Sequence, residues 1–432
     1  MSSQHQSSAS LIVSLLNEHP LDLGTYEEVY KHIHAHPELS LHEAETASTV
    51  AKHSSLSTYT VHTSIGGHGV AGVLVNGEGP TVLLRADMDA LPVEEKTGLE
   101  YASNVKTKDA DDGTATAVMH ACGHDMHVAC LLAASEWLAR KKVRETWVGT
   151  LVVLFQPDEE GGKGAMAMVD DGLYHKVPVP DVVLAQHVMP FKAGKVAVRA
   201  GTMIAAADSF KITLFGRGGH GSMPQLCIDP VLLAANVVVR LQGIVAREVD
   251  PAEAAVLTVG SSQAGHTENV IADKAVLKVD IRSQHAATRD RVLSAMRRIV
   301  EKECEASGCV KPPLFEQIRK FPMTVNDKDV THQLSKTFSH IFGEEFDPKV
   351  VTSNASEDVS DLATSVKKPY CMWFFGGIES ERWDKAERNG RIAEDIPVNH
   401  SALFAPVIQP TLKTGIMTLC AAAWTHLGRR ES

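Results

Sequence analysis

Short apolar runs alternate with helical patterns along the first 200 residues of the chain. The segments 69–77 and 81–92 predict strands, because their apolar residues alternate or run continuously up to glycine or proline turns. The segments 150–157 and 181–188 are β-branched runs typical of buried strands. Before them, the segment 128–142 has helical spacing and ends in basic residues, as helix C-termini prefer. Strands that alternate with helices predict an α/β fold with a mixed, mostly parallel sheet and helices on both faces.

The pattern changes near Gly201. Two amphipathic helices are expected there, and they are separated by two half-exposed strands and flanked by two more. This β-α-β-β-α-β order predicts an inserted ferredoxin-like α+β domain. Because 432 residues exceed what one compact core accommodates, two domains are expected. Their predicted bounds are 1–200 with 322–432 for a discontinuous catalytic domain and 201–321 for the insert.

The composition narrows the class of partner. The net charge is −11, with 53 acidic residues against 42 Lys and Arg, which argues against a nucleic-acid partner. The 21 histidines fit a metal enzyme, and seven cysteines suit reduced thiols in the cytosol. The apolar run Leu11–Leu16 has no basic residue before it and is too short for a signal peptide or a membrane span. The expectation is a cytoplasmic protein without a membrane partner.

The densest cluster of metal-ligand side chains is MHACGHDMH, at Met119–His127. Cys122 and His124 can converge on one point only if the backbone loops between them, and the entrance of a predicted helix allows this. The helix N-terminus would also favour the Cys122 thiolate. A free cysteine beside surface histidines is an equally common interpretation. No further signal assigns a role to His120 or His127, and both are expected to be structural or to support the ligands.

A second cluster, QPDEEGGKGA, follows a predicted buried strand and contains Asp158, Glu159 and Glu160. The carboxyl ends of strands are where α/β enzymes place their sites. One glutamate can bind a metal while its neighbour moves protons. An isolated acidic run is more often a solvated turn, but the core strand before it and the glycine turn after it favour a site.

Four further residues carry weaker signals. Asp87 lies at a strand end beside Asp89, where it could fix the tautomer of a ligating histidine or simply form a turn. His187 ends a predicted strand and alone would more often be a core histidine. His220, in the turn GRGGHGSMP, is either a substrate clamp or only a turn residue. His400, in VNHSALF, has no weight by itself.

The ordered motifs HPELS, RADMDALP, MHACGHDMH, QPDEEGGKGA, QHV, GGHGSMP, ENVIAD and NHSALF resemble those of one family. They are similar to the metal-dependent amidohydrolases related to auxin-conjugate and hippurate hydrolases, within the aminoacylase and zinc-exopeptidase superfamily. The resemblance runs from about His34 to about Ala405. It implies that Cys122 bridges two divalent metal ions. Zinc or manganese is expected, and cobalt is an alternative that the ligand types allow.

The resemblance also assigns roles to individual residues. Glu160 and His400 would complete one metal side and His124 and His187 the other. Glu159 would be the general base that takes a proton from the attacking water. Asp87 would contact the metal-ligating side chains and fix their orientation without binding the metal itself.

For the insert, the resemblance implies a lid that also forms a homodimer. His220 and Asn269 would bind the substrate carbonyl or carboxylate when the lid closes, and Arg282 is a further candidate for the carboxylate. Three departures from the relatives, Asp158, Gln225 and Val359, lie near expected pocket walls.

The expected reaction is hydrolysis of the amide bond of an N-acetyl, N-benzoyl or indole-acyl amino acid. Two alternatives stay open. A dipeptidase or carboxypeptidase of the same superfamily is disfavoured by the cysteine in the metal loop. A non-catalytic metal-binding relative is disfavoured because every expected ligand and the base are present.

Overall fold

The computed structural model describes residues 2–108 and 115–429, which form two compact units. The first contains 1–203, 325–351 and 358–432, and the second contains 204–324 with 352–357. The sequence placed the insert at 201–321, so its expected ends lie within three residues of those of the second unit's main segment. The second unit also takes up a short return segment, 352–357, that the sequence did not indicate.

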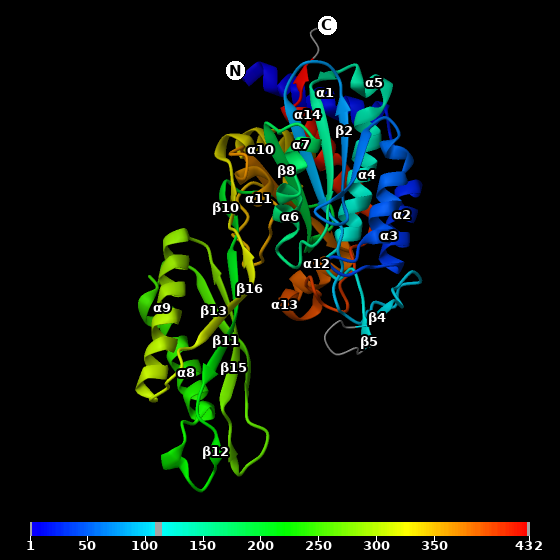
Figure 1. The fold of residues 1–432 in the computed structure, drawn as a ribbon. Coiled ribbons are helices and arrows are strands. Elements are labelled where there is room, and N and C mark those ends of the chain that lie inside the picture. Colours follow the sequence, from blue (N-terminus) through cyan, green and yellow to red (C-terminus); the bar gives the residue numbers. More distant parts are fainter. Residues whose placement is uncertain (1, 109–114, 430–432) are drawn as a thin grey trace. The chain divides into compact units, whose positions relative to one another are not determined.

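The first unit is built on an eight-stranded mixed sheet (Figure 1). Its four central strands are parallel to one another, and antiparallel pairs occur at both ends. These central strands are almost wholly buried, as their apolar runs predicted. In sheet order the strands are β1 (Thr60–Ile65), β2 (Gly69–Val75), β7 (Thr150–Gln156), β3 (Thr81–Asp87), β8 (Val182–Lys192), β19 (Tyr370–Ile378), β9 (Val196–Ala197) and β18 (Phe346–Asp347).

Helices cover both faces of this sheet, which confirms the predicted fold class. The helix α4 (His124–Ala139) is apolar on nearly all sides and is buried between the sheet and the helices α2 and α14. On its side lie α1 (Ser2–Glu18), α2 (Leu23–Ala35), α3 (Ala44–Lys52), α10 (Lys328–Phe342) and α14 (Ile408–His426). The other face carries α6 (Gly164–Asp170), α7 (Leu173–Lys176) and α11 (Ser360–Thr364) (Figure 1).

The second unit has the order expected of a ferredoxin-like domain. Its strands form one antiparallel sheet in the order β13-β15-β11-β16, and α8 and α9 pack together against it. The helix α8 begins at Asp229, whose side chain accepts a hydrogen bond from the Val231 amide at 2.8 Å. The elements are β11 (Ala206–Phe215), α8 (Pro230–Glu248), β13 (Ala255–Ala264), β15 (Lys274–Ser283), α9 (Ala286–Ala306) and β16 (Leu314–Phe321).

The helix α8 is, among the described residues, the one helix long and apolar enough to span a membrane by length and composition alone. Arg240 interrupts its apolar sequence, and one face packs Leu233 and Val237 into the core of its own unit. The opposite face leaves Leu232 61% and Val239 71% exposed. The helix therefore has both a core face and an exposed apolar face.

Short elements complete the described chain. In the first unit they are the 3-10 helices at Ser54–Leu56 and Gly343–Glu345, with β4 (Lys106–Lys108), β5 (Ala115–Ala117), α5 (Lys141–Arg144), β6 (Trp147–Val148), α12 (Ser380–Arg388), α13 (Ile392–Asp395) and β20 (Gly428–Arg429). The second unit adds β12 (Gly219–His220), β14 (Val270–Ile271) and a 3-10 helix at Pro224–Leu226. The strands β10 (Gly201–Ile204) and β17 (Thr324–Asn326) contain two of the points where the chain passes between the units, and the segment 352–357 adds the other two.

Candidate metal centre

The turn that leads into α4 brings Cys122 and His124 together. Gly123 has φ +84°, a left-handed conformation that reverses the chain between them. A Cβ at Gly123 would lie only 2.4 Å from Cγ1 of Val188, so no larger residue fits this approach. His124 is then the first residue of α4, and both side chains are buried.

Cys122 belongs to two groups of donor atoms. It forms one group with His124 and His187 and the other with Glu160 and His400, and within each group the donor atoms lie within 4.8 Å of one another. The Cys122 Sγ lies 3.4 Å from Nε2 of His187 and 3.3 Å from Nε2 of His400. The His400 Nε2 lies 3.0 Å from Oε1 of Glu160. The structure thus divides these five residues as the resemblance implied.

Strands and loops position the other donor residues. Glu160 follows β7 after a short turn, and His187 lies within β8; in the sheet, β3 lies between these two parallel strands. The sequence placed His187 at the end of its strand, but β8 continues to Lys192. His400 comes from a loop before α14, and its amide donates to the Ala121 carbonyl at 2.8 Å. That backbone bond places His400 beside the Cys122 turn.

In His124 and His187 the Nδ1 atom bonds to a carbonyl oxygen, as it does in many metal-ligating histidines. The Nδ1 of His124 lies 2.9 Å from the Asp89 carbonyl oxygen, and the Nδ1 of His187 lies 2.8 Å from that of Val188. These acceptors require a proton on Nδ1, so Nε2 is the nitrogen left for a cation in both rings. Burial alone would lower the pKa of His124, but Asp87 and then Asp89 raise it to about 10, so without cations Nε2 of His124 also carries a proton, which a bound cation would displace. Within the described ranges, the His124 Nε2 is buried and has no hydrogen-bond partner. Three imidazoles, a carboxylate and a shared thiol fit a pair of divalent cations.

The electrostatics of the thiol correct one sequence expectation. Burial, and next the carboxylates of Glu160 and Glu159, raise the pKa of the Cys122 thiol well above its ordinary value. The expected effect of the α4 N-terminus, a thiolate, is therefore wrong for the protein without cations. The reason is that carboxylates gather around the sulfur and that it is buried. A thiolate here requires bound positive charge.

Asp87 supports the centre from the end of β3. Its Oδ1 lies 2.5 Å from Nδ1 of His127, and its Oδ2 accepts from Nη1 of Arg85 at 2.5 Å and lies 3.8 Å from Nε2 of His124. Burial alone would raise the pKa of Asp87, but His124 and then Arg85 hold it well below its ordinary value. The Nε2 of His127 in turn accepts the Val188 amide at 2.8 Å. Asp87 is therefore an ionised anchor that fixes a histidine beside the donor groups.

Glu159 lies next to the donor atoms without belonging to either Cys122 group. It is 4% exposed, and its Oε2 lies 4.0 Å from the Nε2 of His124. Together with His124 and Glu160 it forms a further group of close donor atoms. A buried carboxylate in this position can exchange protons with a molecule bound at the centre.

A buried network behind α4 escaped the sequence analysis. His34 lies between two carboxylates, with Nδ1 2.6 Å from Asp125 and Nε2 3.0 Å from Glu95. Asp125 directly follows the candidate ligand His124. The three residues are separated by 91 and 61 positions, so no local spacing could reveal the network. The HPELS segment, which begins just after His34, was the nearest signal.

In the second unit, His220 and Asn269 lie on two separate loops that the short strands β12 and β14 hold together. The strands β12 and β14 pair His220 with Val270, and the Gly221 amide donates to the Asn269 carbonyl at 2.8 Å. Both side chains are exposed, and the His220 Nδ1 accepts the Ser222 amide at 3.1 Å. The two predicted substrate contacts are therefore close neighbours on two paired loops.

Arg282 lies elsewhere in the same unit. It is near the far end of β15, where its Nε donates to Asp280 at 2.7 Å and its Nη1 to the Ser356 hydroxyl at 2.9 Å. The length of β15 separates it from Asn269. The structure does not group Arg282 with the other two candidates.

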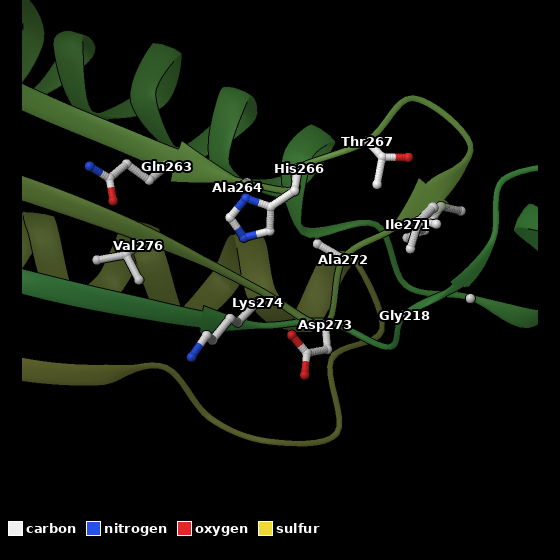
Figure 2. A pocket seen from close by; sticks show the side chains of 13 residues that line it. Gly218, Gln263, Ala264, His266, Thr267, Ile271, Ala272, Asp273, Lys274 and Val276 are labelled. Atoms are coloured by element: carbon white, nitrogen blue, oxygen red, sulfur yellow. The ribbon is translucent and has the colours of Figure 1, made fainter.

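A pocket of about 530 Å³ opens beside the paired strands β12 and β14, and all its lining residues belong to the second unit (Figure 2). Figure 2 shows His266 from the turn after β13, with Asp273 and Lys274 at the start of β15. Apolar side chains of Val270, Ile271, Ala272 and Val276 form much of its wall, together with the backbone of Gly218 and Gly219. The pocket thus borders the paired strands β12 and β14, beside His220 and Asn269.

The α/β fold and the shared-cysteine donor set define a metallohydrolase of amide bonds. The family model of peptidase family M20/M25/M40 matches residues 83–407. The chain belongs to this family, and the prediction of an amide-bond hydrolase is confirmed.

The most similar relatives cover most of the chain. A hippurate hydrolase from Campylobacter jejuni is 38% identical over 82% of this chain and 88% of its own length. Thermostable carboxypeptidase 2 from Saccharolobus solfataricus is 35% identical over 90% and 92%. The IAA-amino acid hydrolase ILR1-like 2 from Arabidopsis thaliana is 33% identical over 89% and 85%. The resemblance to hippurate and auxin-conjugate hydrolases is confirmed.

Solved structures agree with the fold. A chain from methicillin-resistant Staphylococcus aureus, described as an aminohydrolase, superposes with a TM-score of 0.78 at 30% identity and covers 96% of this chain and 99% of its own. The Bacillus subtilis YXEP protein, described as a dinuclear metal-binding peptidase of family M20, has a TM-score of 0.70 at 24% identity and covers 93% and 97%.

Proposed function

We propose that the protein hydrolyses the amide bond of N-acyl amino acids at a pair of divalent cations shared by Cys122. The observation that supports this most directly is the membership of Cys122 in two donor groups, with Glu159 adjacent to both. One thiol between two sets of ligands fits two neighbouring cations better than a single one. Relatives named for hippurate and for IAA-amino acids support the substrate class.

The residues divide the work of the reaction. Cations held by Cys122, His124, Glu160, His187 and His400 would supply Lewis-acid activation of water and of the amide carbonyl. Glu159 accepts the proton of the attacking water and passes it to the leaving nitrogen. Asp87 keeps His127 fixed behind the ligands, so that the ligating side chains hold one orientation.

The donor types bear on which metal is used. A thiolate and imidazoles favour soft or borderline ions, and carboxylates accept harder ones. Zinc or manganese fits this mixed set, and cobalt is a third candidate. Metal added back to stripped protein, with each ion in turn, tests this choice.

The exposed positions of His220 and Asn269 support a role for both at the substrate. Each side chain is exposed on its own loop, and the β12–β14 pair holds the two loops together. An imidazole and an amide there can bind the amide carbonyl or the carboxylate of an N-acyl amino acid. This makes the second unit a lid in the proposed function.

The same unit offers a surface for a homodimer. The strand β13 is at the edge of its sheet, and α8, which packs beside it, exposes Leu232 and Val239. An edge strand next to an exposed apolar helix face is a common dimer interface. We expect two copies of the chain to associate through α8 and β13.

A carboxypeptidase is the second candidate function, because one close relative has that name. A panel of N-acetyl, N-benzoyl and indole-acyl amino acids, assayed beside N-blocked and free dipeptides, separates the two. Turnover of small N-acyl amino acids without turnover of peptides supports the proposal. Preference for the peptides would replace it with the second candidate.

A further inference from the structure

The turn that carries Glu159 is unusually tight. It joins β7 to α6, and Asp158 has φ +51°, a left-handed conformation that a non-glycine residue adopts at a cost. A Cβ at Gly161 would lie 2.0 Å from the Asp158 carboxylate, and one at Gly164 would lie 1.7 Å from the Pro157 carbonyl oxygen. Such a turn must be held in shape by contacts from outside it.

Two buried carboxyl groups provide those contacts, one on each side of Glu159. The amide of Asp158 donates to Oε1 of Glu43 at 2.8 Å. The amide of Glu160 donates to Oδ2 of Asp89 at 3.0 Å. Glu43 is 0% and Asp89 1% exposed, so water does not compete for either bond. The backbone of Glu159 is clamped between them.

The two halves of the clamp differ in what else they hold. Asp89 also accepts a bond from Ser40 and contacts the His124 ring, so its loss would disturb a metal ligand directly. Glu43 precedes α3, and its Oε1 also accepts the Leu41 amide at 3.0 Å. Glu43 is therefore the half whose effect can be separated from metal binding.

The second oxygen of Glu43 faces no protein donor. Its Oε2 is buried and has no hydrogen-bond partner among the described residues. Burial raises the pKa of Glu43 to about 7. An amide side chain at this position can therefore keep the bond that the Oε1 atom makes.

We infer that Glu43 is a positioning residue for the proposed base: it fixes the backbone before Glu159 and so directs the Glu159 carboxylate toward the metal centre. This inference rests on the proposed role of Glu159. The competing explanation is that Glu43 only stabilises the segment before α3 through the Leu41 amide.

Substitutions at Glu43 separate these explanations. Glu43→Gln keeps the acceptor, Glu43→Leu removes it at similar size, and Glu43→Asp withdraws it by one methylene. We expect Glu43→Leu to lower kcat by about 10- to 100-fold with little change in KM, because small displacements of a catalytic group have effects of this size. Glu43→Gln should recover most of the turnover, and Glu43→Asp should fall between them. Should the leucine variant not fold, the aspartate variant provides the same comparison.

Glu38 provides a matched control. Its carboxylate accepts the amides of Glu45 and Thr46 at 3.0 and 2.8 Å, so it bonds to the first turn of α3 rather than to the Glu159 turn. Glu38→Leu should lower thermal stability while kcat stays within about threefold. Equal losses of kcat in the Glu38 and Glu43 variants would show that both act through α3 and would overturn the inference.

Two readouts do not depend on activity. In Glu43→Leu, metal content per chain should stay at the wild-type level, while hydrogen exchange of the segment 156–165 should accelerate in the metal-free protein. Unchanged exchange, or loss of metal, would overturn the inference.

A double-mutant cycle tests the connection to Glu159. If Glu43 acts through the base, Glu43→Leu should add less than about threefold to the loss caused by Glu159→Gln. Multiplication of the two losses would show an independent, structural role. Wild-type turnover of Glu159→Gln alone would instead refute the proposed base, whatever Glu43→Leu does to exchange.

Discussion

The Nε2 of His400 lies 3.3 Å from the Sγ of Cys122, although 278 positions separate the two residues in the chain. The His400 side chain is about half exposed, whereas Cys122 is buried. His400 thus closes the centre from its open side, and the Ala121 carbonyl fixes its backbone. The donor set is complete only when a late loop returns to the turn before α4.

This arrangement predicts how metal content responds to single substitutions. Cys122→Ser should lower metal content from about two ions per chain to below one, since the thiol belongs to both donor groups. His187→Ala and His400→Ala should each remove about one ion. Elemental analysis after gel filtration measures these numbers. Equal loss in all three variants would show that the two groups do not bind separately.

A second prediction separates the two adjacent glutamates. Glu159→Gln should retain metal but lower kcat by at least ~100-fold, the usual effect of losing a general base. Glu160→Gln should weaken metal retention, because its carboxylate faces His400 and Cys122. Metal content and kcat measured on the same preparations check both. If metal falls with Glu159→Gln and not with Glu160→Gln, the roles must be exchanged.

A third prediction concerns removal of the cations. The centre gathers Asp87, Glu159, Glu160 and the Cys122 thiol in a buried volume. Treatment with a chelator should therefore lower the thermal midpoint as well as activity, because the carboxylates then repel one another. Re-addition of zinc or manganese should restore both. An unchanged thermal midpoint after verified removal would argue against bound ions as part of the fold.

Local patterns were sufficient for the fold and for part of the site. The apolar runs of β7 and β8 predicted buried parallel strands, and the end of β7 predicted where Glu160 would lie. His187 was expected at the end of its strand but lies within β8. The loop at Cys122 could be predicted because two ligand residue types lie two positions apart at the start of a predicted helix. These signals involve residues that are close in sequence, so the local backbone geometry decides which side chains can come together.

Other contacts have no local signal. His400 was found only through the order of motifs, since its loop gives no periodicity. Arg85 reaches Asp358, 273 positions away, through a buried ion pair that no spacing rule anticipates. Glu43 was not singled out from the sequence, because its partner is the Asp158 amide, 115 positions away. Tertiary packing alone decides such pairs.

A fourth prediction is a pH dependence of stability from His34. Burial alone would lower its pKa, but Asp125 and Glu95 outweigh it and raise the pKa to about 9. The charged histidine therefore stabilises the fold fully below its ordinary pKa, and this contribution is lost as the pH rises through about 9. The size is roughly 1–3 kcal/mol.

Replacement of His34 tests that sign. The difference in thermal midpoint between the wild type and His34→Gln should be large at about pH 6 and small at about pH 10. His53, which is half-buried and whose pKa burial lowers, provides a control of the opposite kind. A difference that grows with pH would contradict a charged His34 in the network.

A fifth prediction concerns His220 in the second unit. His220→Ala should lower kcat more than it alters metal content or the thermal midpoint, because His220 is exposed and lies outside the donor groups. If the histidine instead serves assembly, kcat should stay near normal while the oligomeric state changes. Sedimentation of the same preparation separates these results.

Co-expression shows whether His220 acts across a dimer. A dimer of one His220→Ala and one Glu159→Gln chain contains one site with both residues intact only if His220 reaches its partner's centre. When equal amounts of the two chains pair at random, about half of the dimers contain one chain of each kind. One of the two sites in each such dimer is then intact, so about a quarter of wild-type activity should return. Val239→Glu, placed on the exposed face of α8, should abolish that recovery by preventing association. No recovery in stable mixed dimers would place the histidine at the site of its own chain, since each mixed dimer would then lack one essential residue in both sites.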